Sequence, residues 1–294
     1  MATYFESSDA LYSSTSMSRS SSSTGASRQA SPAEISPVPT SPMEGLQGVP
    51  IHHFTTIRDL RKCVRSHSAK LQAGRSNQQY LVFQGVTKRD LNEIDRERAS
   101  IGKHTRMTHY ADTNELIVKL MPSVEHELAH LTLVRKLDAA VIGMGLPVES
   151  LIPLGGTKFS GPNFSKEGDS AFKPLSRVQK ADWPTLVFES GLSESLSRLR
   201  IDARLWLTHS GGNVKIVITI SITPAERMLL VEKWCLSPVP DRPLTRGHPT
   251  SETEVPTRMQ EVRITLNPPA PPNPAGQSGT SIRPSATTQQ SLTI

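Results

Sequence analysis

The stretch from Thr185 to Ile222 constrains the fold more than any other part of the chain. It opens with Thr185-Leu-Val-Phe188, a short apolar run typical of a strand that is buried on both faces of a sheet. Apolar residues then recur on one helical stripe, which consists of Leu192, Leu196, Leu199, Ala203 and Trp206. Strict alternation of apolar residues from Val214 to Ile222 predicts a second strand. A strand, a helix and a strand in this order are typical of an α/β domain.

Weaker patterns extend this unit on both sides. Apolar residues at helical spacing predict a helix from Ser123 to about Ile142, which Gly143 and Gly145 end. Shorter patterns predict helices at 56–71 and 88–99 and strands at 79–86, 106–110, 115–120, near 151, at 170–172 and at 262–266. The complete order predicts an α/β fold with a mixed sheet, preceded by additional N-terminal helices and strands.

The two ends of the chain are poor in periodic apolar residues. The first fifty residues contain the run Ser20–Ser23 and three Ser-Pro pairs, and the chain after about Asn267 is rich in proline. Such segments bury too little apolar surface to offset the chain entropy that folding removes. We therefore expect disordered tails at 1–50 and 267–294 and a single α/β domain at 51–266, which is long enough for an ordinary core.

Signals for secretion and membrane insertion are lacking in the sequence. The first residues have neither the basic nor the apolar region of a secretory signal, and the longest apolar runs are too short to span a bilayer. Cys63 and Cys235 are expected to be reduced thiols, because a lone pair in such a chain is rarely a disulfide. We expect an intracellular protein of the nucleus or cytoplasm that binds no membrane. Its oligomeric state is not readable.

Positive charge is concentrated in one segment of the chain. The chain carries a net charge of +6, and residues 51–110 hold twelve Lys and Arg against five Asp and Glu, a local excess of seven. Such an excess suits the phosphate backbone of a nucleic acid. We prefer the interpretation of a solvated helical surface, because aromatic residues are not interleaved and the acids of Asp90–Arg98 interrupt the cations.

Three acidic residues stand where a structural role explains them poorly. Glu189 ends the buried strand, Asp169 begins the strand before it, and Glu127 falls within the apolar stripe of the helix at 123–142. A buried carboxylate must be paired or bound to a metal, because desolvating it alone costs on the order of several kcal/mol. Carboxylates at adjacent strand ends form a hard oxygen site for Mg²⁺ or Mn²⁺. Alternatively, Asp169 caps a turn and Glu189 caps the following helix.

Three segments, Glu115–Glu127, Gly168–Pro174 and Trp183–Gly191, carry a resemblance to a known family. They resemble the PD-(D/E)XK restriction-endonuclease-like superfamily, and in particular uncharacterised fungal members with a Pro-Thr-Leu-Val-x-Glu-x-Gly strand. The resemblance spans about 115–222 and implies an αβββαβ core. It implies that Asp169 and Glu189 bind Mg²⁺, with Glu127 as an auxiliary acid. It also implies that the substrate is DNA or, less often, RNA.

One position departs from the family pattern. The family's lysine follows the second acid by two residues, and here that position is Gly191. Some members supply the lysine from a neighbouring element, and the candidates here are Lys215, Arg198 and Arg200. We prefer Lys215, because arginine does not lose its proton. The predicted catalytic set of a Mg²⁺-dependent nuclease is thus Asp169, Glu189 and Lys215. The alternative is a catalytically degenerate chain.

A second motif competes with this interpretation. His126-Glu127-Leu-Ala-His130 matches H-E-x-x-H, in which two histidines ligate Zn²⁺ and the glutamate acts as general base of a metallopeptidase. The sequence that follows lacks the glycine and third histidine of the metzincin extension, and both histidines are expected to point away from the apolar stripe. That stripe consists of Val124, Leu128, Leu131 and Val134. We favour the nuclease-like interpretation. A non-catalytic module that binds nucleic acid or protein is the third possibility.

Overall fold

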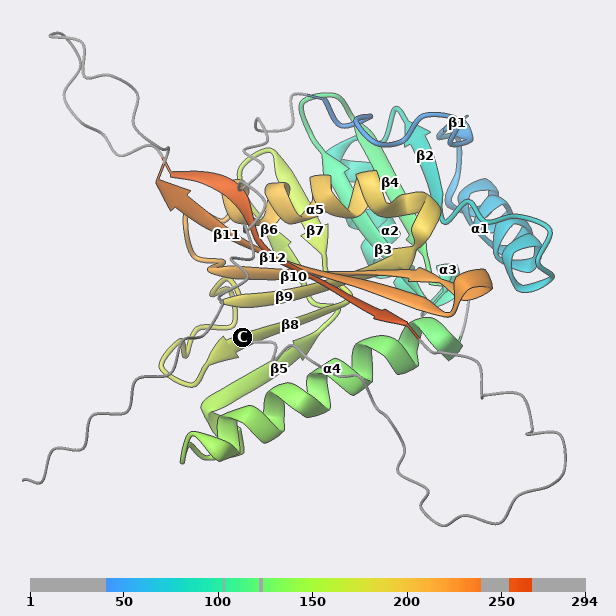
Figure 1. The fold of residues 1–294 in the computed structure, drawn as a ribbon. Coiled ribbons are helices and arrows are strands. Elements are labelled where there is room, and N and C mark those ends of the chain that lie inside the picture. The colour runs from blue at the N-terminus through green and yellow to red at the C-terminus, as the bar shows by residue number, and fades with distance from the viewer. Residues whose placement is uncertain (1–40, 103, 122–123, 239–253, 266–294) are drawn as a thin grey trace, which may run out of the picture. The chain divides into compact units, whose positions relative to one another are not determined.

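The computed structural model describes residues 41–102, 104–121, 124–238 and 254–265, and the side chains of all of these except 124–129 and 194 (Figure 1). All of them belong to one compact unit, Ala33–Ile294. No helix in these ranges is long and apolar enough to cross a membrane. The predicted tails lie outside the described residues, apart from 41–50.

Residues 41–50 form turns that pack onto the folded unit, although we placed them in the N-terminal tail. Leu46 and Val49 are buried in an apolar cluster with Tyr80 and Val82. Arg198 donates hydrogen bonds to backbone carbonyls in the same segment. Two apolar side chains and these backbone acceptors hold a segment whose Ser/Pro composition concealed them, so the folded part begins before Ile51.

The C-terminal sheet has six strands in the order β12-β11-β10-β9-β8-β5. β9 and β10 run parallel and the other described neighbours run antiparallel, so the sheet is mixed. Its strands are β5 (Leu151–Gly155), β8 (Ser170–Pro174), β9 (Leu186–Leu192), β10 (Ile216–Thr223), β11 (Met228–Pro238) and β12 (Glu254–Thr265). Helices α4 (Val124–Gly143) and α5 (Leu196–His209) cover its opposite faces (Figure 1).

These elements confirm the predicted α/β class with a mixed sheet. α4, β5, β8, β9, α5 and β10 follow one another in the αβββαβ order that the resemblance implies. Two short strands interrupt this order after β5, namely β6 (Lys158–Ser160) and β7 (Phe164–Glu167). Both pair within a second sheet instead.

The N-terminal sheet also has six strands, in the order β1-β2-β4-β3-β7-β6. Besides β6 and β7 it contains β1 (Ile51–His53), β2 (Tyr80–Gln84), β3 (Thr105–Tyr110) and β4 (Glu115–Leu120). Three helices accompany it: α1 (Ile57–Gln72), α2 (Lys88–Arg96) and α3 (Arg98–Ile101). Apolar residues of α1, α2 and α3 share one buried cluster with β2, β3 and β4, so these helices cover one face of the sheet.

Helix α5 lies between the two sheets. Ala203 and Trp206 pack on the C-terminal sheet, as the predicted stripe requires. Ile201 and Leu205 pack on Phe164 of β7, which belongs to the N-terminal sheet. The single stripe that the sequence predicts therefore understates the burial of α5, and charged residues of this helix, which a surface helix would expose to water, are buried as well.

Helix α4 is rotated relative to the prediction. Among its described side chains, from residue 130 on, His130, Leu137 and Val141 are buried and Val134 is partly buried beside them, whereas Leu131 is 47% exposed. The inner face thus follows positions 130, 134, 137 and 141, about one residue away from the stripe we predicted. The expectation that His130 points away from the apolar side is wrong, since its ring packs edge-on against Phe188 of β9.

Candidate functional site

Asp169 and Glu189 lie side by side at one end of the C-terminal sheet. Asp169 immediately precedes β8, and Glu189 is the fourth residue of β9. Ser170 is paired with Phe188 in the β8–β9 register, which brings Asp169 next to Glu189. Glu189 shares the face of Val187, which α5 covers. Both acidic side chains are fully buried.

Lys119 bridges the two acids. Its Nζ donates to Asp169 Oδ2 and to Glu189 Oε2, each at 2.9 Å. Lys119 comes from β4 of the N-terminal sheet and is only 4% exposed. Burial alone would lower the pKa of this ammonium, but the carboxylates of Asp169 and Glu189 raise that pKa well above its usual value. The lysine is therefore charged and occupies a position between two carboxylates where a metal ion could also stand.

Further hydrogen bonds orient each carboxylate. The backbone N–H and the hydroxyl of Ser190 donate to Asp169 Oδ2 at 2.7 and 3.0 Å. The indole N–H of Trp206 donates to Glu189 Oε1 at 2.8 Å. Arg106 Nε lies 3.9 Å from Asp169 Oδ1. Residues of both sheets hold the Asp169 carboxylate, and Lys119 and Trp206 of α5 hold the Glu189 carboxylate.

Alternating charges continue from Glu189 into helix α5. Lys166 of β7 lies 3.3 Å from Glu189 and 3.0 Å from Asp202, and Arg198 lies 3.2 Å from the same oxygen of Asp202. Burial would raise the pKa of Asp202, but Lys166 and Arg198 hold it below its ordinary value. Three acids and three cations thus form one buried chain, which we call the charge cluster: Asp169, Lys119, Glu189, Lys166, Asp202 and Arg198.

Tyr80 of β2 is paired with Lys119 of the charge cluster in the β2–β4 register, so the two residues lie side by side on neighbouring strands. The Tyr80 side chain is buried, and this burial raises the pKa of its phenol. The charge of Lys119 lowers that pKa, and the charges of Asp202 and Glu189 raise it. The Tyr80 oxygen has no hydrogen-bond partner among the described residues. A buried hydroxyl without a partner costs about 1–3 kcal/mol. A ligand oxygen bound at the cluster would supply a partner.

A neighbouring carboxylate, Glu232 of β11, belongs to a separate pair network. It is fully buried and lies 2.6 Å from Arg200 and 3.0 Å from Arg258. The β9–β10–β11 register places it in one row with Glu189, because Thr219 of β10 is paired with both residues. Its ion-pair partners among the described residues are two arginines, and Thr219 and Trp234 also donate to it at 3.4 and 3.2 Å. A single acid without a lysine partner in the described chain offers a matched control for the Asp169–Glu189 pair.

The structure does not bring Lys215 to the acids. Lys215 is exposed and precedes β10 by one residue. Glu189 is paired with Thr219, four residues further on, which corresponds to about 13 Å along the strand. Lys119 and Lys166 take the place that we assigned to Lys215. Neither could be placed from the sequence because β4 and β7 belong to the other sheet, although a lysine within the apolar strand Glu115–Leu120 already implies a buried partner.

Gly191, which stands at the family's lysine position, is packed too tightly for a side chain. A Cβ atom there would lie 2.5 Å from Ser195 Oγ, 3.1 Å from Gln79 Oε1 and 3.3 Å from Leu199 Cδ1. Gln79 Oε1 also accepts a hydrogen bond from the backbone N–H of Leu192 at 2.6 Å. The end of β9 is thus sealed against β2 and α5, and a lysine has no room at this position.

The auxiliary acid and the zinc motif are described only in part. Glu127 and His126 belong to α4, but their side chains lie outside the described residues. α4 covers the face of the sheet that Phe188 points to, opposite the face of Glu189. His130 of the motif is buried against Phe188. Among the described side chains, no group of three or more His, Cys, Asp and Glu is arranged to hold a metal ion.

Comparisons with known proteins give little further information. No family model matches the chain, and no curated protein matches it. A solved structure from Anabaena variabilis ATCC 29413, described as "a putative nuclease belonging to DUF820", aligns with 46% of this chain and 81% of its own, at 17% identity and a TM-score of 0.33. Similarity at this level does not establish a common activity. The resemblance to fungal members gains no support from these comparisons.

Proposed function

We propose that the chain is a nuclease-like, metal-dependent phosphodiesterase of the PD-(D/E)XK type that acts on DNA. Asp169 and Glu189 are its metal-binding acids, and Lys119 takes the part that we first gave to Lys215. The observation that carries the proposal is the convergence of two carboxylates from neighbouring strands on one ammonium, 2.9 Å from an oxygen of each. Carboxylate oxygens are the ligands that Mg²⁺ and Mn²⁺ prefer.

The charges of the cluster set a condition on metal binding. Its three acids are already balanced by three cations. Two additional positive charges in a buried region cost on the order of several kcal/mol unless a cation leaves or an anion enters. A divalent ion held by Asp169 and Glu189 would therefore require the Lys119 ammonium to give up its bridging position. The negative charge of a substrate phosphate would then compensate this ammonium.

The neighbouring residues keep the two acids in place for this reaction. A Mg²⁺ or Mn²⁺ ion, when bound, would lower the pKa of a coordinated water and stabilise the charge on the phosphate. Ser190 fixes the Asp169 carboxylate through two donors, and Trp206 fixes Glu189. Lys166 neutralises Glu189 from the side of α5. Glu127 stays a predicted auxiliary acid.

A cleavage assay tests the proposal. Wild-type protein is incubated with plasmid and linear DNA in Mg²⁺, in Mn²⁺ and in EDTA. Asp169→Asn and Glu189→Gln should each abolish cleavage. Glu232→Gln, which removes an equally buried carboxylate from the neighbouring network, and Lys215→Ala should retain it. Melting temperatures of all variants are measured to check that each is folded, and electron paramagnetic resonance of Mn²⁺ measures ion binding independently of cleavage.

A non-catalytic role is the second candidate, and the complete burial and charge balance of the cluster favour it. If the folded wild type binds no Mn²⁺ and cuts no DNA with either ion, the enzyme proposal is wrong. The cluster is then a structural link between the two sheets. Cleavage that survives in both Asp169→Asn and Glu189→Gln would instead place the active site elsewhere in the chain.

A further inference from the structure

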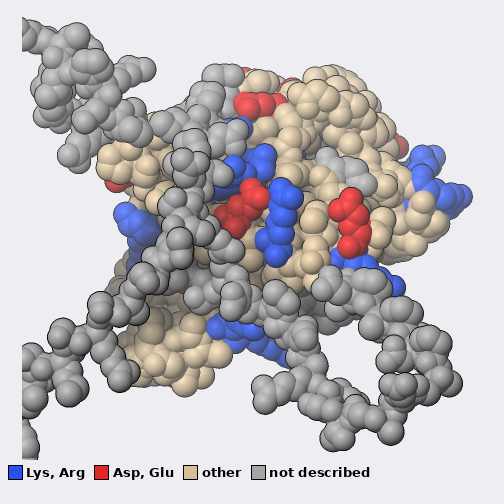
Figure 2. All heavy atoms as spheres, in the orientation of Figure 1, with Lys and Arg blue, Asp and Glu red and all other residues tan. Residues whose placement is uncertain are grey.

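The outward face of α1 is a continuous basic surface. Arg58, Arg61, Lys62 and Arg65 stand at positions i, i+3, i+4 and i+7, which lie on one side of a helix. The buried residues Leu60, Val64 and Leu71 occupy the opposite side. Arg58, Lys62 and Arg65 are exposed and Arg61 is half-buried. We call these four cations the α1 stripe, and Figure 2 shows basic side chains at the edge where Figure 1 draws α1.

The structure separates this stripe from the acids that interrupt the cations in the sequence. Four of the five acids in residues 51–110 lie in α2 or at its C-cap: Asp90, Glu93, Asp95 and Glu97. The fifth, Asp59, accepts hydrogen bonds from Thr55 and Thr56 at the start of α1, at 2.9 and 2.6 Å. Within the described part of the chain, no stripe residue forms an ion pair. The preference for a mixed-charge helical surface therefore holds for α2 and fails for α1.

Like charges at these spacings do not stabilise a helix. Each repelling pair at i, i+3 or i, i+4 costs about 0.2–0.5 kcal/mol. The four stripe residues contain several such pairs, and α1 has only one acid to compensate them. An anionic partner would turn this repulsion into attraction.

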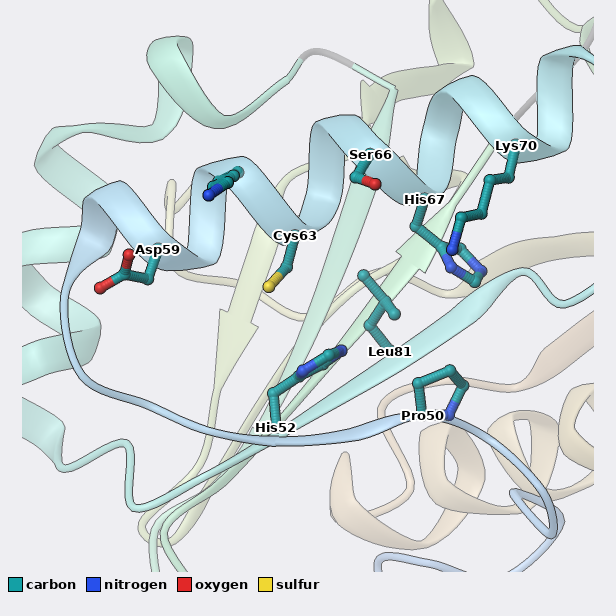
Figure 3. A pocket seen from close by; sticks show the side chains of 9 residues that line it. Pro50, His52, Asp59, Cys63, Ser66, His67, Lys70 and Leu81 are labelled. Atoms are coloured by element: carbon teal, nitrogen blue, oxygen red, sulfur yellow. The ribbon is translucent and has the colours of Figure 1, made fainter.

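A cavity beside the stripe extends the basic surface. It has a volume of about 440 Å³ and lies between α1 and the strands β1 and β2 (Figure 3). Lys62 of the stripe, His67 and Lys70 line it from the helix together with one acid, Asp59, and His52 lines it from β1. Figure 3 shows the rings of His52 and His67 and the Lys70 side chain turned toward this space. The cavity therefore offers further donors for an anionic group next to the stripe.

The chemistry of this surface fits a nucleic acid better than an anionic membrane. A helix that binds in the lipid interface combines its basic face with exposed Trp, Phe or Leu. The apolar face of α1 is buried in the core, and the large exposed apolar residues of the described chain lie outside α1. The stripe covers eight residues from Arg58 to Arg65, about 10 Å along the helix. A duplex presents several phosphates over such a length, one per about 1.7 Å of its axis.

We propose that the α1 stripe, together with Lys70 at the adjacent cavity, binds the phosphate backbone of a nucleic acid without reading its sequence. The surface lies outside the αβββαβ core and does not depend on the proposed cleavage reaction. Phosphate contacts of this kind fix the register of a protein on nucleic acid and are strongly salt-dependent.

Binding of the full chain to a fluorescent 20-base-pair DNA in EDTA tests this proposal without any contribution from cleavage. In the stripe variant, Arg58, Arg61, Lys62 and Arg65 are all replaced by Gln. The matched control replaces four exposed cations elsewhere, Arg89, Arg135, Lys136 and Lys180, so that net charge falls equally. Each phosphate contact makes the slope of log affinity against log salt steeper by about 0.9, so each lost contact makes it shallower by the same amount. The wild type should therefore lose about a hundred-fold more affinity than the stripe variant between 50 and 200 mM salt.

Three results would overturn the proposal. The stripe variant could bind as tightly as wild type, or the control variant could lose as much affinity as the stripe variant, which would show that only net charge matters. In the third result, the wild type binds no DNA but binds vesicles of phosphatidylserine and phosphatidylcholine through the stripe. Circular dichroism melting serves as the folding control, and we expect the stripe variant to melt no lower than wild type because it loses repulsion.

Discussion

Replacement of Lys119 by Met removes the charge between Asp169 and Glu189 while nearly preserving the length of the side chain. Removal of one partner from a buried ion pair costs about 3–5 kcal/mol, because the other charge stays buried without compensation. Lys119 forms ion pairs with two fully buried carboxylates, each at 2.9 Å. We therefore expect the free energy of unfolding to fall by an amount at the upper end of this range, about 5 kcal/mol. For a unit of this size, each kcal/mol changes the melting temperature by about 2–4 °C. Calorimetry should therefore show a fall of about 10–20 °C.

The same variant tests whether the two acids form a divalent-ion site. Without the ammonium, Mn²⁺ has access to both carboxylates, and at about a hundred times its Kd it should restore about 2.7 kcal/mol. Arg200→Met is the control, because it leaves Glu232 as a single carboxylate that Arg258 still pairs. Mn²⁺ should not raise its melting temperature. A Lys119→Met protein within about 1 kcal/mol of wild type, or equal recovery of both variants in Mn²⁺, would refute the reasoning.

Two further predictions concern residues outside the charge cluster. His109 is buried and hydrogen-bonded to the Val86 carbonyl at 2.7 Å, and burial lowers the pKa of its imidazole below the ordinary value of 6.5. As pH falls, the unfolded chain therefore takes up a proton on His109 before the folded chain does. This difference should lower the free energy of unfolding below pH 6.5 by up to about 1.4 kcal/mol per pH unit. Urea unfolding at pH 7.5 and 5.5 should show a smaller loss in His109→Gln than in wild type, and an equal loss would contradict the assignment. Gly191→Ala should lower the free energy of unfolding by about 1–3 kcal/mol, because its Cβ would meet Ser195 Oγ at 2.5 Å. An unchanged urea midpoint would show that Ser195 moves away without cost.

The sequence predicted the part of the fold whose patterns are local. The helix and strands around 185–222 could be read because their apolar residues follow one period each. Of the acids of the cluster, Asp169 and Glu189 stood out at the ends of predicted strands, whereas Asp202 was missed. Three strands of the N-terminal sheet were predicted one by one, but their assembly with β6 and β7 into a second sheet was not. In the sequence, Arg198 and Asp202 look like residues of an exposed helical face. They are buried because β7 packs against this side of α5.

The lysine of the site was missed for a related reason. Lys119 lies 70 residues before Glu189 and on the other sheet, whereas we searched near Gly191. The rotation of α4 has a smaller cause. Leu131 and Val134 are both apolar, so the sequence allows one stripe through Leu131 and another through Val134, Leu137 and Val141. Contact with Phe188 and Ile218 selects the second stripe.

The charge cluster also limits how this protein can change by mutation. Each of its six members neutralises a neighbour that belongs to a different strand or to α5. A single charge-altering substitution strands the opposite charge in the interior, whereas exchanging both partners for well-packed apolar residues is often neutral. Viable sequences are therefore separated by paired substitutions. A change at position 119, 166 or 198 should cost less stability together with one at 169, 189 or 202 than alone.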